Sequence, residues 1–263
     1  FRSYIQWLHR VFGSAYIWSS RWLLLPLLAP VLITVALIQS YIHQHDLIIL
    51  ELIFGVLVLL LCLGPRDLGE EVASYHRARA DGDEAACKNI ETDLCAGPMR
   101  LSVRNADGYQ RSLIRGILLQ GHERYFSVLV WFFILGPIGA VAYRLVSSMP
   151  GILYRIGAGF KARMLAQRFH GTLAWIPLHI TVLLFALAGD SRAVFNIGTK
   201  QYPDRSELDG QWRLLAQAGQ AAVQDDLNDE VEHDLDIAMS LLKQVLMLLL
   251  GIFALFTIGG WLA

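Results

Sequence analysis

The sequence has few charged residues and few cysteines. Only 17% of its 263 residues are Asp, Glu, Lys or Arg, whereas a soluble domain has about 25%. The formal net charge is -1, so no excess of cations points to nucleic acid as a partner. Cys62, Cys87 and Cys95 show no CxxC spacing, and an odd, sparse set indicates reduced structural thiols instead of a disulfide framework or a metal site.

The sequence also lacks the common motifs of enzymes. It contains no P-loop, no GxSxG nucleophile elbow and no HExxH zinc motif. The acidic run at 225–236 lacks the spacing and the central glycine of an EF-hand. His43 and His45 alone on a short turn are weak evidence for a metal. We therefore predict no catalytic residue, metal or cofactor, and the sequence favours a protein that is not an enzyme.

Long apolar runs are the main positive feature. The chain is 55% hydrophobic, and a membrane-spanning helix needs about 20 mostly apolar residues. Five runs approach that length, so we predict an all-α polytopic transmembrane helix bundle, with the lipid bilayer as its first partner. They cover residues 22–42, 47–64, 126–146, 171–189 and 241–262.

The residues between these runs divide the chain into six predicted segments. Because the sequence begins at Phe1 without a methionine, we also expect residues upstream of it. The segments are an amphipathic N-terminal segment (1–21), a transmembrane hairpin (22–64), a cytoplasmic, membrane-apposed helical subdomain (65–125), a transmembrane or re-entrant segment with a basic interfacial helix and a fourth apolar helix (126–189), an acidic helical loop (190–240) and a C-terminal transmembrane helix (241–263).

Lys and Arg residues mark cytoplasmic loops. The turn at 43–46 has none, which places it outside, whereas 1–21 and 65–125 are arginine-rich and belong inside. Residues 147–170 hold four cations and no acid, yet they would lie outside if 126–146 crossed once. Either Gly136-Pro137 breaks this run into a re-entrant pair, or the run crosses against the rule. Both alternatives stay open, as does the side of 190–240.

The basic residues of this stretch follow a helical pattern. Lys161, Arg163 and Arg168 oppose an apolar face, which predicts a helix lying in the headgroup plane. The alternative is a site for an anionic ligand or a lipid headgroup. The apolar face comprises Phe160, Met164, Leu165 and Phe169.

Several stretches between about 65 and 190 resemble the AmpE family. The most specific is ERYFSVLVWFF at 123–133, followed by LGPIGAVAYRL at 135–145. RDL at 66–68 with ADGD at 80–83, and WIPLH at 175–179, agree with it. The resemblance implies a bacterial inner-membrane regulator associated with beta-lactamase induction, within a superfamily that includes the CobD/CbiB membrane proteins of cobalamin synthesis.

The chain departs from the cobalamin enzymes at positions where those enzymes carry carboxylates. Leu119, Gln120 and Glu123 stand where the resemblance implies a Glu-Asn pair and an Asp. His170-Gly171 replaces paired aspartates, and His179 replaces an arginine. Fewer carboxylates leave fewer ligands for magnesium and phosphate chemistry, so the AmpE branch fits better.

Candidate site residues lie near the ends of the apolar runs. Arginine and carboxylate side chains bracket both ends of the 65–125 subdomain, and we predict that they pair. An ionisable group inside an apolar run is costly unless it is paired or wet. The ligand-binding candidates are Arg66, Asp67, Glu123, Arg124, Tyr143, Arg144, His170 and His179, and Glu51 is an intramembrane polar candidate.

Three functions of different class follow. The first is a non-catalytic membrane sensor of a muropeptide or another anionic small molecule, linked to cell-wall recycling and beta-lactamase regulation. The second is an amide-forming enzyme of the CobD/CbiB kind. The third is a transporter of small solutes or lipid-linked molecules, which with five spans would need a homo-oligomer.

Overall fold

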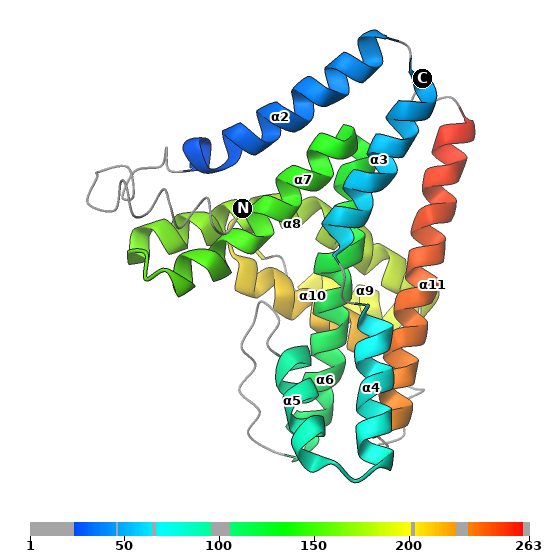
Figure 1. Ribbon diagram of the computed structural model, residues 1–263. Helices are drawn as coiled ribbons and strands as arrows, with labels where there is room; N and C mark the ends of the chain where they lie inside the picture. Colours follow the sequence, from blue (N-terminus) through cyan, green and yellow to red (C-terminus); the bar gives the residue numbers. More distant parts are fainter. Residues whose placement is uncertain are drawn as a thin grey trace. The chain divides into compact units, whose positions relative to one another are not determined.

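The computed structural model describes residues 24–45, 47–64, 67–95, 106–200, 203–224 and 231–259, and their regular structure is entirely helical (Figure 1). Four of its helical stretches are long and apolar enough to cross a membrane: Ile48–Ala80, Arg111–Arg155, Phe160–Ala188 and Val231–Ile258. The chain is therefore an all-α membrane helix bundle, as predicted. The expected amphipathic segment at 1–21 lies outside the described residues.

The chain divides into two compact units. The first unit consists of residues 1–63, 127–175 and 205–208, and the second of 64–126, 176–204 and 209–263. The first contains α2 (Leu24–Gln44), α3 (Ile48–Leu63), α7 (Ser127–Arg155) and the beginning of α8 (Phe160–Ala188). The second contains the rest of α8, α4 (Leu68–Ala80), α5 (Glu84–Cys95), α6 (Ala106–Gly121), the π-helix η3 (His122–Phe126), α9 (Ser191–Lys200), α10 (Leu208–Ala222) and α11 (Val231–Ile258).

In the first unit, α2 and α3 form the predicted antiparallel hairpin. The turn is short: α2 ends at Gln44 and α3 begins at Ile48. Large apolar side chains on this hairpin face outward, and Leu61 is 80% exposed. In water such a surface would be unfavourable, whereas in a bilayer it is the surface expected of lipid-facing helices.

Gly136-Pro137, where one of the two alternatives places a break, divides α7 into two limbs. Gly136 has φ 66° and ψ -155°, a backbone conformation that glycine adopts without steric cost. A Cβ on Gly139 would collide with the carbonyl oxygen of Trp131 and would lie 2.7 Å from the Cβ of Leu135. Residues eight apart in a straight helix are separated by about 12 Å, so the chain reverses direction here, as Figure 1 shows.

The reversal brings the end of α7 back to the beginning of α2. The bend lies near the turn of the hairpin, because a Cβ on Gly136 would be 3.5 Å from the Gln39 amide nitrogen. In contrast, Leu28 near the start of α2 shares a buried cluster with the second limb and the first turns of α8. That cluster comprises Leu28, Leu145, Val146, Met149, Ile152, Leu153, Ala158, Ala162 and Ala166.

Helix α8 corrects one sequence prediction. We expected an interfacial helix at 160–169 and a separate apolar helix from Gly171, but α8 runs without interruption from Phe160 to Ala188. Gly171 is needed for packing, because a Cβ there would lie 3.3 Å from the carbonyl oxygen of Ser206. Trp131 also donates its indole N–H to the carbonyl of Leu173, at 3.1 Å.

In the second unit, the start of α4 follows the sequence signals. Asp67 caps α4, and its Oδ1 accepts from the backbone N–H of Gly69 at 3.0 Å. Gly82, with φ 69°, ends the turn between α4 and α5. The apolar stripe of α6 is buried, with Leu113, Ile114, Ile117 and Leu118 at 0–1% exposure.

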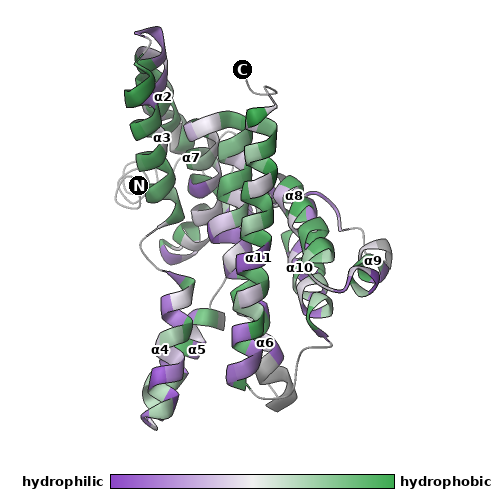
Figure 2. Ribbon diagram, turned by 90° about the vertical axis from the view of Figure 1, so that its right-hand side faces the viewer, coloured by the Kyte–Doolittle hydropathy of each residue, from purple (hydrophilic) through white to green (hydrophobic). Residues whose placement is uncertain are grey.

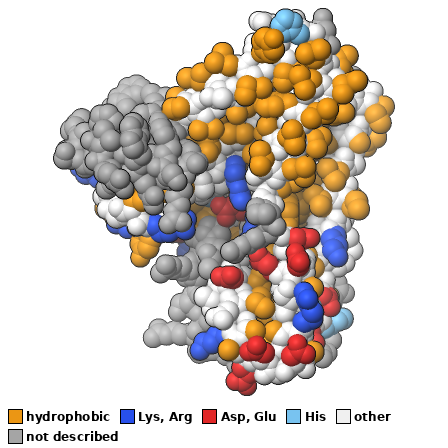
Figure 3. Space-filling view, in the orientation of Figure 1, with side chains coloured by type: hydrophobic (Ala, Val, Ile, Leu, Met, Phe, Trp, Pro, Cys, Tyr) orange, Lys and Arg blue, Asp and Glu red, His pale blue; other side chains and the backbone are white. Residues whose placement is uncertain are grey.

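The fifth apolar run is the second half of a longer helix. α11 begins at Val231 with acidic residues in its first turn and continues to Ile258. Figure 2 shows the change along it from hydrophilic to hydrophobic residues. In Figure 3, hydrophobic side chains gather over α3 and the C-terminal part of α11, and charged side chains gather over α4.

Candidate functional site

The candidate site lies around η3, the π-helical turn between α6 and α7. Such turns are rare, often occur at functional sites, and change the direction in which the following side chains point. Here the segment is HERYF, and its residues contact α4 and α8 within the second unit. It lies within the stretch that carries the family resemblance.

Arg124 pairs with a carboxylate of α4. Its Nη1 donates to Oε1 of Glu71 at 3.2 Å, and the two side chains are only 19% and 18% exposed. The second oxygen of Glu71, Oε2, is buried and has no hydrogen-bond partner among the described residues. A charge-assisted pair in this setting is stronger than one in open water, and it occupies only one of the two Glu71 oxygens.

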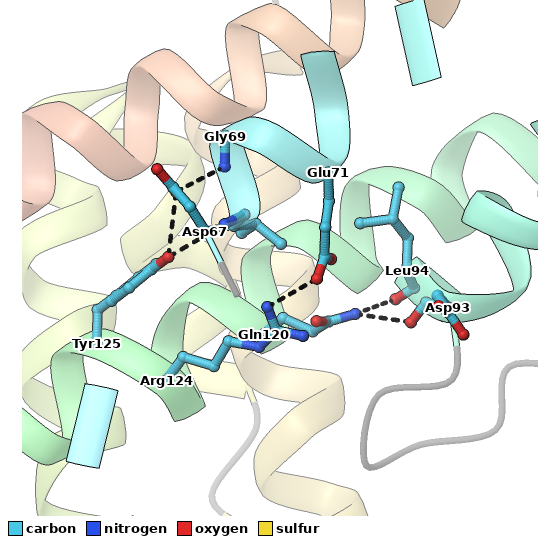
Figure 4. A network of polar contacts seen from close by, with 9 residues as sticks. Asp67, Gly69, Glu71, Asp93, Leu94, Gln120, Arg124 and Tyr125 are labelled. Atoms are coloured by element: carbon cyan, nitrogen blue, oxygen red, sulfur yellow. Dashed lines mark hydrogen bonds and ion pairs between the residues drawn. The ribbon is translucent and has the colours of Figure 1, made fainter. Parts of the chain in front are cut away.

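Tyr125 joins η3 to the first residues of α4. Its hydroxyl oxygen accepts from the backbone N–H of Leu68 at 3.2 Å, and its O–H donates to Oδ1 of Asp67 at 3.5 Å. Figure 4 shows Arg124 and Tyr125 reaching together from η3 toward Glu71 and Asp67. The two contacts hold the end of the subdomain against its beginning.

The two ends of the subdomain are paired, but through Glu71 and not through a carboxylate that we predicted. Arg124 binds Glu71, which the sequence analysis did not single out, while Asp67 is occupied by a helix cap and a tyrosine. Glu123 is partly buried in the same turn. Arg66 lies outside the described residues. Glu71 escaped notice because an acid in the first turn of a helix is ordinary and is explained by the helix dipole alone.

His122, also in η3, contacts α8. Its Nδ1 lies 3.0 Å from Oγ1 of Thr181, and both side chains are buried. The Thr181 hydroxyl donates its one proton to the carbonyl oxygen of Pro177 at 2.9 Å. His122 must then be the donor to Thr181, so its Nδ1 carries a hydrogen. The contact fixes the tautomer of this buried imidazole and joins η3 to α8.

Gln120, one of the positions where the chain departs from the cobalamin enzymes, has a structural contact. Its amide nitrogen donates to the backbone carbonyls of Asp93 at 3.1 Å and Leu94 at 2.6 Å (Figure 4). These carbonyls belong to the last turn of α5, where no N–H of the same helix is left to bind them. The residue therefore caps α5.

The remaining candidates fall elsewhere. Tyr143 and His170 come together in the first unit, buried, with Oη and Nε2 3.4 Å apart and the rings edge to face. Arg144 is partly buried on α7. Glu51 lies at the turn of the hairpin, 3.8 Å from Nδ1 of His43. His179 lies on α8 in the second unit and is partly buried.

No group of three or more His, Cys, Asp or Glu side chains within the described ranges is arranged to hold a metal ion. The polar chemistry that these ranges offer around η3 is a set of charged and hydrogen-bonding groups. It consists of an Arg guanidinium held by one carboxylate oxygen, a second carboxylate oxygen without a partner, and a tyrosine hydroxyl.

Comparison with known proteins agrees with the resemblance. The model of the family described as "Regulatory signalling modulator protein AmpE" matches residues 5–263. The cobalamin biosynthesis protein CobD of Chromobacterium violaceum is 28% identical over 158 residues, which are 59% of this chain and 49% of that protein. CobD of Stutzerimonas stutzeri is 27% identical over 151 residues, 56% of this chain and 48% of that protein.

The chain thus spans about half the length of the curated relatives it matches. No solved structure matches it. The family match covers both units and includes η3, the broken helix α7 and α11. The chain belongs to the AmpE family, within a group of CobD/CbiB-like membrane proteins.

Proposed function

We propose that the chain is a multi-pass protein of a bacterial inner membrane that senses a small anionic ligand and signals without catalysing a reaction. Its ligand would be a muropeptide or a similar carboxylate-bearing product of cell-wall recycling, and its output would be the regulation of beta-lactamase expression. The AmpE family description, a regulatory signalling modulator, supports this role.

The Glu71–Arg124 pair is the observation that carries the proposal. Glu71 holds Arg124 through one oxygen only, so a carboxylate on a ligand would replace it as the charged acceptor and would add the bidentate contact that Glu71 does not make. Both side chains of the pair are partly exposed, so a ligand can reach them. They are also shielded enough from water that replacing Glu71 by the carboxylate of a ligand would have an energetic effect. Releasing Glu71 would loosen α4 from η3, and a ligand that binds only the released form shifts the population toward it.

Two positions at which this chain departs from the cobalamin enzymes support a non-catalytic role. The amide nitrogen of Gln120 donates a hydrogen bond to the last turn of α5, and His170 packs against Tyr143. Both are positions where the resemblance implies carboxylate-rich sites in the cobalamin enzymes. In this chain the same positions stabilise the fold.

Replacing either partner of the ion pair tests the proposal. Arg124→Gln removes the guanidinium, and we expect it to weaken the beta-lactam response about tenfold, the value of one charged hydrogen bond. Glu71→Gln frees Arg124, and we expect a raised signal without inducer. The measurement is a beta-lactamase reporter in cells whose own copy has been deleted.

Two controls make this experiment decisive. Arg77→Gln removes an exposed arginine whose side-chain hydrogen bonds, among the described residues, stay within α4, and it should leave the response unchanged. The exchange Glu71→Arg with Arg124→Glu restores a pair of opposite charges and should recover the insertion and the melting temperature but not the ligand response. Wild-type responses from both single variants, in protein that still inserts, would contradict the proposal.

The similarity to two CobD proteins favours one alternative, an amide-forming enzyme. Corrinoid binding by the purified chain decides between the two. Tight binding, together with rescue of growth in a cell that lacks CobD, would establish the enzyme. The sensor predicts neither result.

A further inference from the structure

A basic and aromatic ridge crosses the end of α7 and the beginning of α8 in the first unit. We define it by Tyr154, Arg155, Phe160, Lys161, Met164 and Arg168. All six are exposed, and Phe160 (67%) and Tyr154 (57%) are exposed to an extent unusual for aromatic residues. The ridge plays no part in the η3 site, and its interpretation does not depend on the signalling role.

The packing of α8 explains why these side chains point outward. Ala158, Ala162 and Ala166 face the buried cluster that contains Leu28, and their small size lets α8 lie close to it. Since successive residues of a helix turn by about 100°, Phe160 and Met164 lie on the opposite face. We expected Phe160, Met164, Leu165 and Phe169 to form a face turned away from the cations, and this is wrong for Phe160 and Met164, which lie among them.

Charge on this surface has one sign. No Asp or Glu occurs between Glu123 and Asp190, so no acid of this stretch neutralises the ridge. Arg163 lies beside it, with its guanidinium carbon 5.6 Å from the centre of the Tyr154 ring. Its Nε is buried and lacks a hydrogen-bond partner among the residues that the structure describes. The surface therefore presents the exposed cations Arg155, Lys161 and Arg168.

Exposed apolar side chains between the cations favour a membrane surface over a soluble anion as the ligand of the ridge. A soluble anion or a nucleic acid gives Phe160 and Met164 nothing to bury against, whereas the boundary of a bilayer accepts phenyl and thioether groups below its phosphates. Charge complementarity then selects acidic headgroups over zwitterionic ones.

The fold of the first unit places the ridge where headgroups would be. The reversal of α7 at Gly136 returns the chain to Leu28, at the end of α2 remote from the 43–47 turn. That end of an apolar hairpin is a membrane boundary. We propose that the ridge binds the headgroups of anionic phospholipids in the leaflet that meets this end.

The test measures lipid preference directly. The full chain is purified in dodecyl maltoside, and energy transfer from its native tryptophans to dansyl-phosphatidylglycerol or dansyl-phosphatidylcholine is titrated. We expect the wild-type chain to prefer the anionic lipid about tenfold, and the triple variant Arg155→Gln, Lys161→Gln, Arg168→Gln to lose that preference.

A matched variant controls for net charge. Arg77→Gln, Lys88→Gln, Arg192→Gln removes three exposed cations of the second unit and should keep the preference. Phe160→Ser with Met164→Ser should weaken the binding of both lipids alike, since it removes the apolar contact only. If the glutamine triple variant fails to fold, Arg155→Lys with Arg168→Lys keeps the charge and should keep the preference, while Lys161→Gln alone should lower it about two- to threefold.

Three outcomes would overturn the proposal. One is an unchanged preference in the folded glutamine variant. Another is an equal loss in the control variant, which would mean that net charge and not the ridge selects the lipid. The last is displacement of the dansyl lipid by millimolar inorganic phosphate, which would make the ridge a site for a soluble anion.

Discussion

Gly139 lies where the second limb of α7 passes the carbonyl oxygen of Trp131. A side chain there has no room, because a Cβ would also press against the Cβ of Leu135 at 2.7 Å. Gly151, further along the same helix, has nothing within 4 Å of the Cβ position. A side chain is therefore excluded by the packing at Gly139 and has free space at Gly151.

We predict opposite effects for alanine at these two positions. Gly139→Ala should destabilise the protein by about 1–3 kcal/mol, the usual cost of overpacking. Gly151→Ala should stabilise it by about 0.5–1 kcal/mol, because alanine loses less backbone entropy in a helix. Thermal unfolding in one detergent checks both. Equal melting temperatures would mean that the limbs do not meet as described.

Residues of the site were harder to predict than residues of the fold. The cap formed by Asp67 has a local signal in the sequence, which is an acid directly before an apolar stripe. Glu71 and Gln120 act on partners 53 and 26 residues away, and nothing in the local sequence gives such distances. The Tyr143–His170 contact is similar, since both residues were candidates but their proximity follows only from the fold.

At the scale of elements, α4 and α5 pack through a partly buried carboxylate. Burial raises the pKa of Glu91 above its ordinary value of 4.5, and a hydrogen bond from Tyr75 acts in the opposite direction. The net rise means that the folded chain holds the Glu91 proton more tightly than the unfolded chain does.

The sign of this shift predicts a pH dependence. The contribution of Glu91 to stability is fully present below its unfolded pKa and is lost as the pH rises through the folded value. Glu91→Gln keeps an acceptor for Tyr75 and carries no charge, so we expect it to raise the melting temperature at pH 7 but not at pH 4. A gain of equal size at both pH values would exclude this explanation.

Elements were predictable where their signals are local. The hairpin of α2 and α3, the start of α4 and the break at Gly136 all follow from apolar runs, caps and a Gly-Pro step. Whether α7 folds back was undecidable, since it depends on the approach of Gly139 to Trp131. η3 has no sequence signal that separates a π-helical turn from an ordinary one. α8 was divided wrongly because Gly171 resembles a helix stop, whereas it makes room for Ser206.

At the scale of the whole molecule, the reversal of α7 bears on the side of the membrane that each loop faces. Gln44 lies at one end of the α2–α3 hairpin, and the residues before α8 lie near Leu28 at the other end. A re-entrant α7 thus puts the cations of 155–168 at the same end of the hairpin as Leu63, where α3 ends, which the positive-inside rule makes the cytoplasmic end. The alternative, a single crossing, would separate them.

Cysteine labelling distinguishes these topologies. With the native cysteines replaced by serine, we expect Gln44→Cys to react with a membrane-impermeant maleimide in intact cells, and Gly159→Cys only after permeabilisation. Both positions are exposed, and nothing lies within 4 Å of a Cβ at Gly159. Labelling of both from the same side would refute the re-entrant topology.

Pro137, which opens the second limb of α7, has a further consequence in lipid. The first four N–H groups of a helix have no carbonyl to bind within it, and hydrocarbon offers them no water. Proline has no N–H and already has the φ of a first helical residue, so it lowers the number of such orphan donors at the bend by one. An alanine at 137 would restore that donor at the tip of the bend, where the bilayer supplies nothing to accept it.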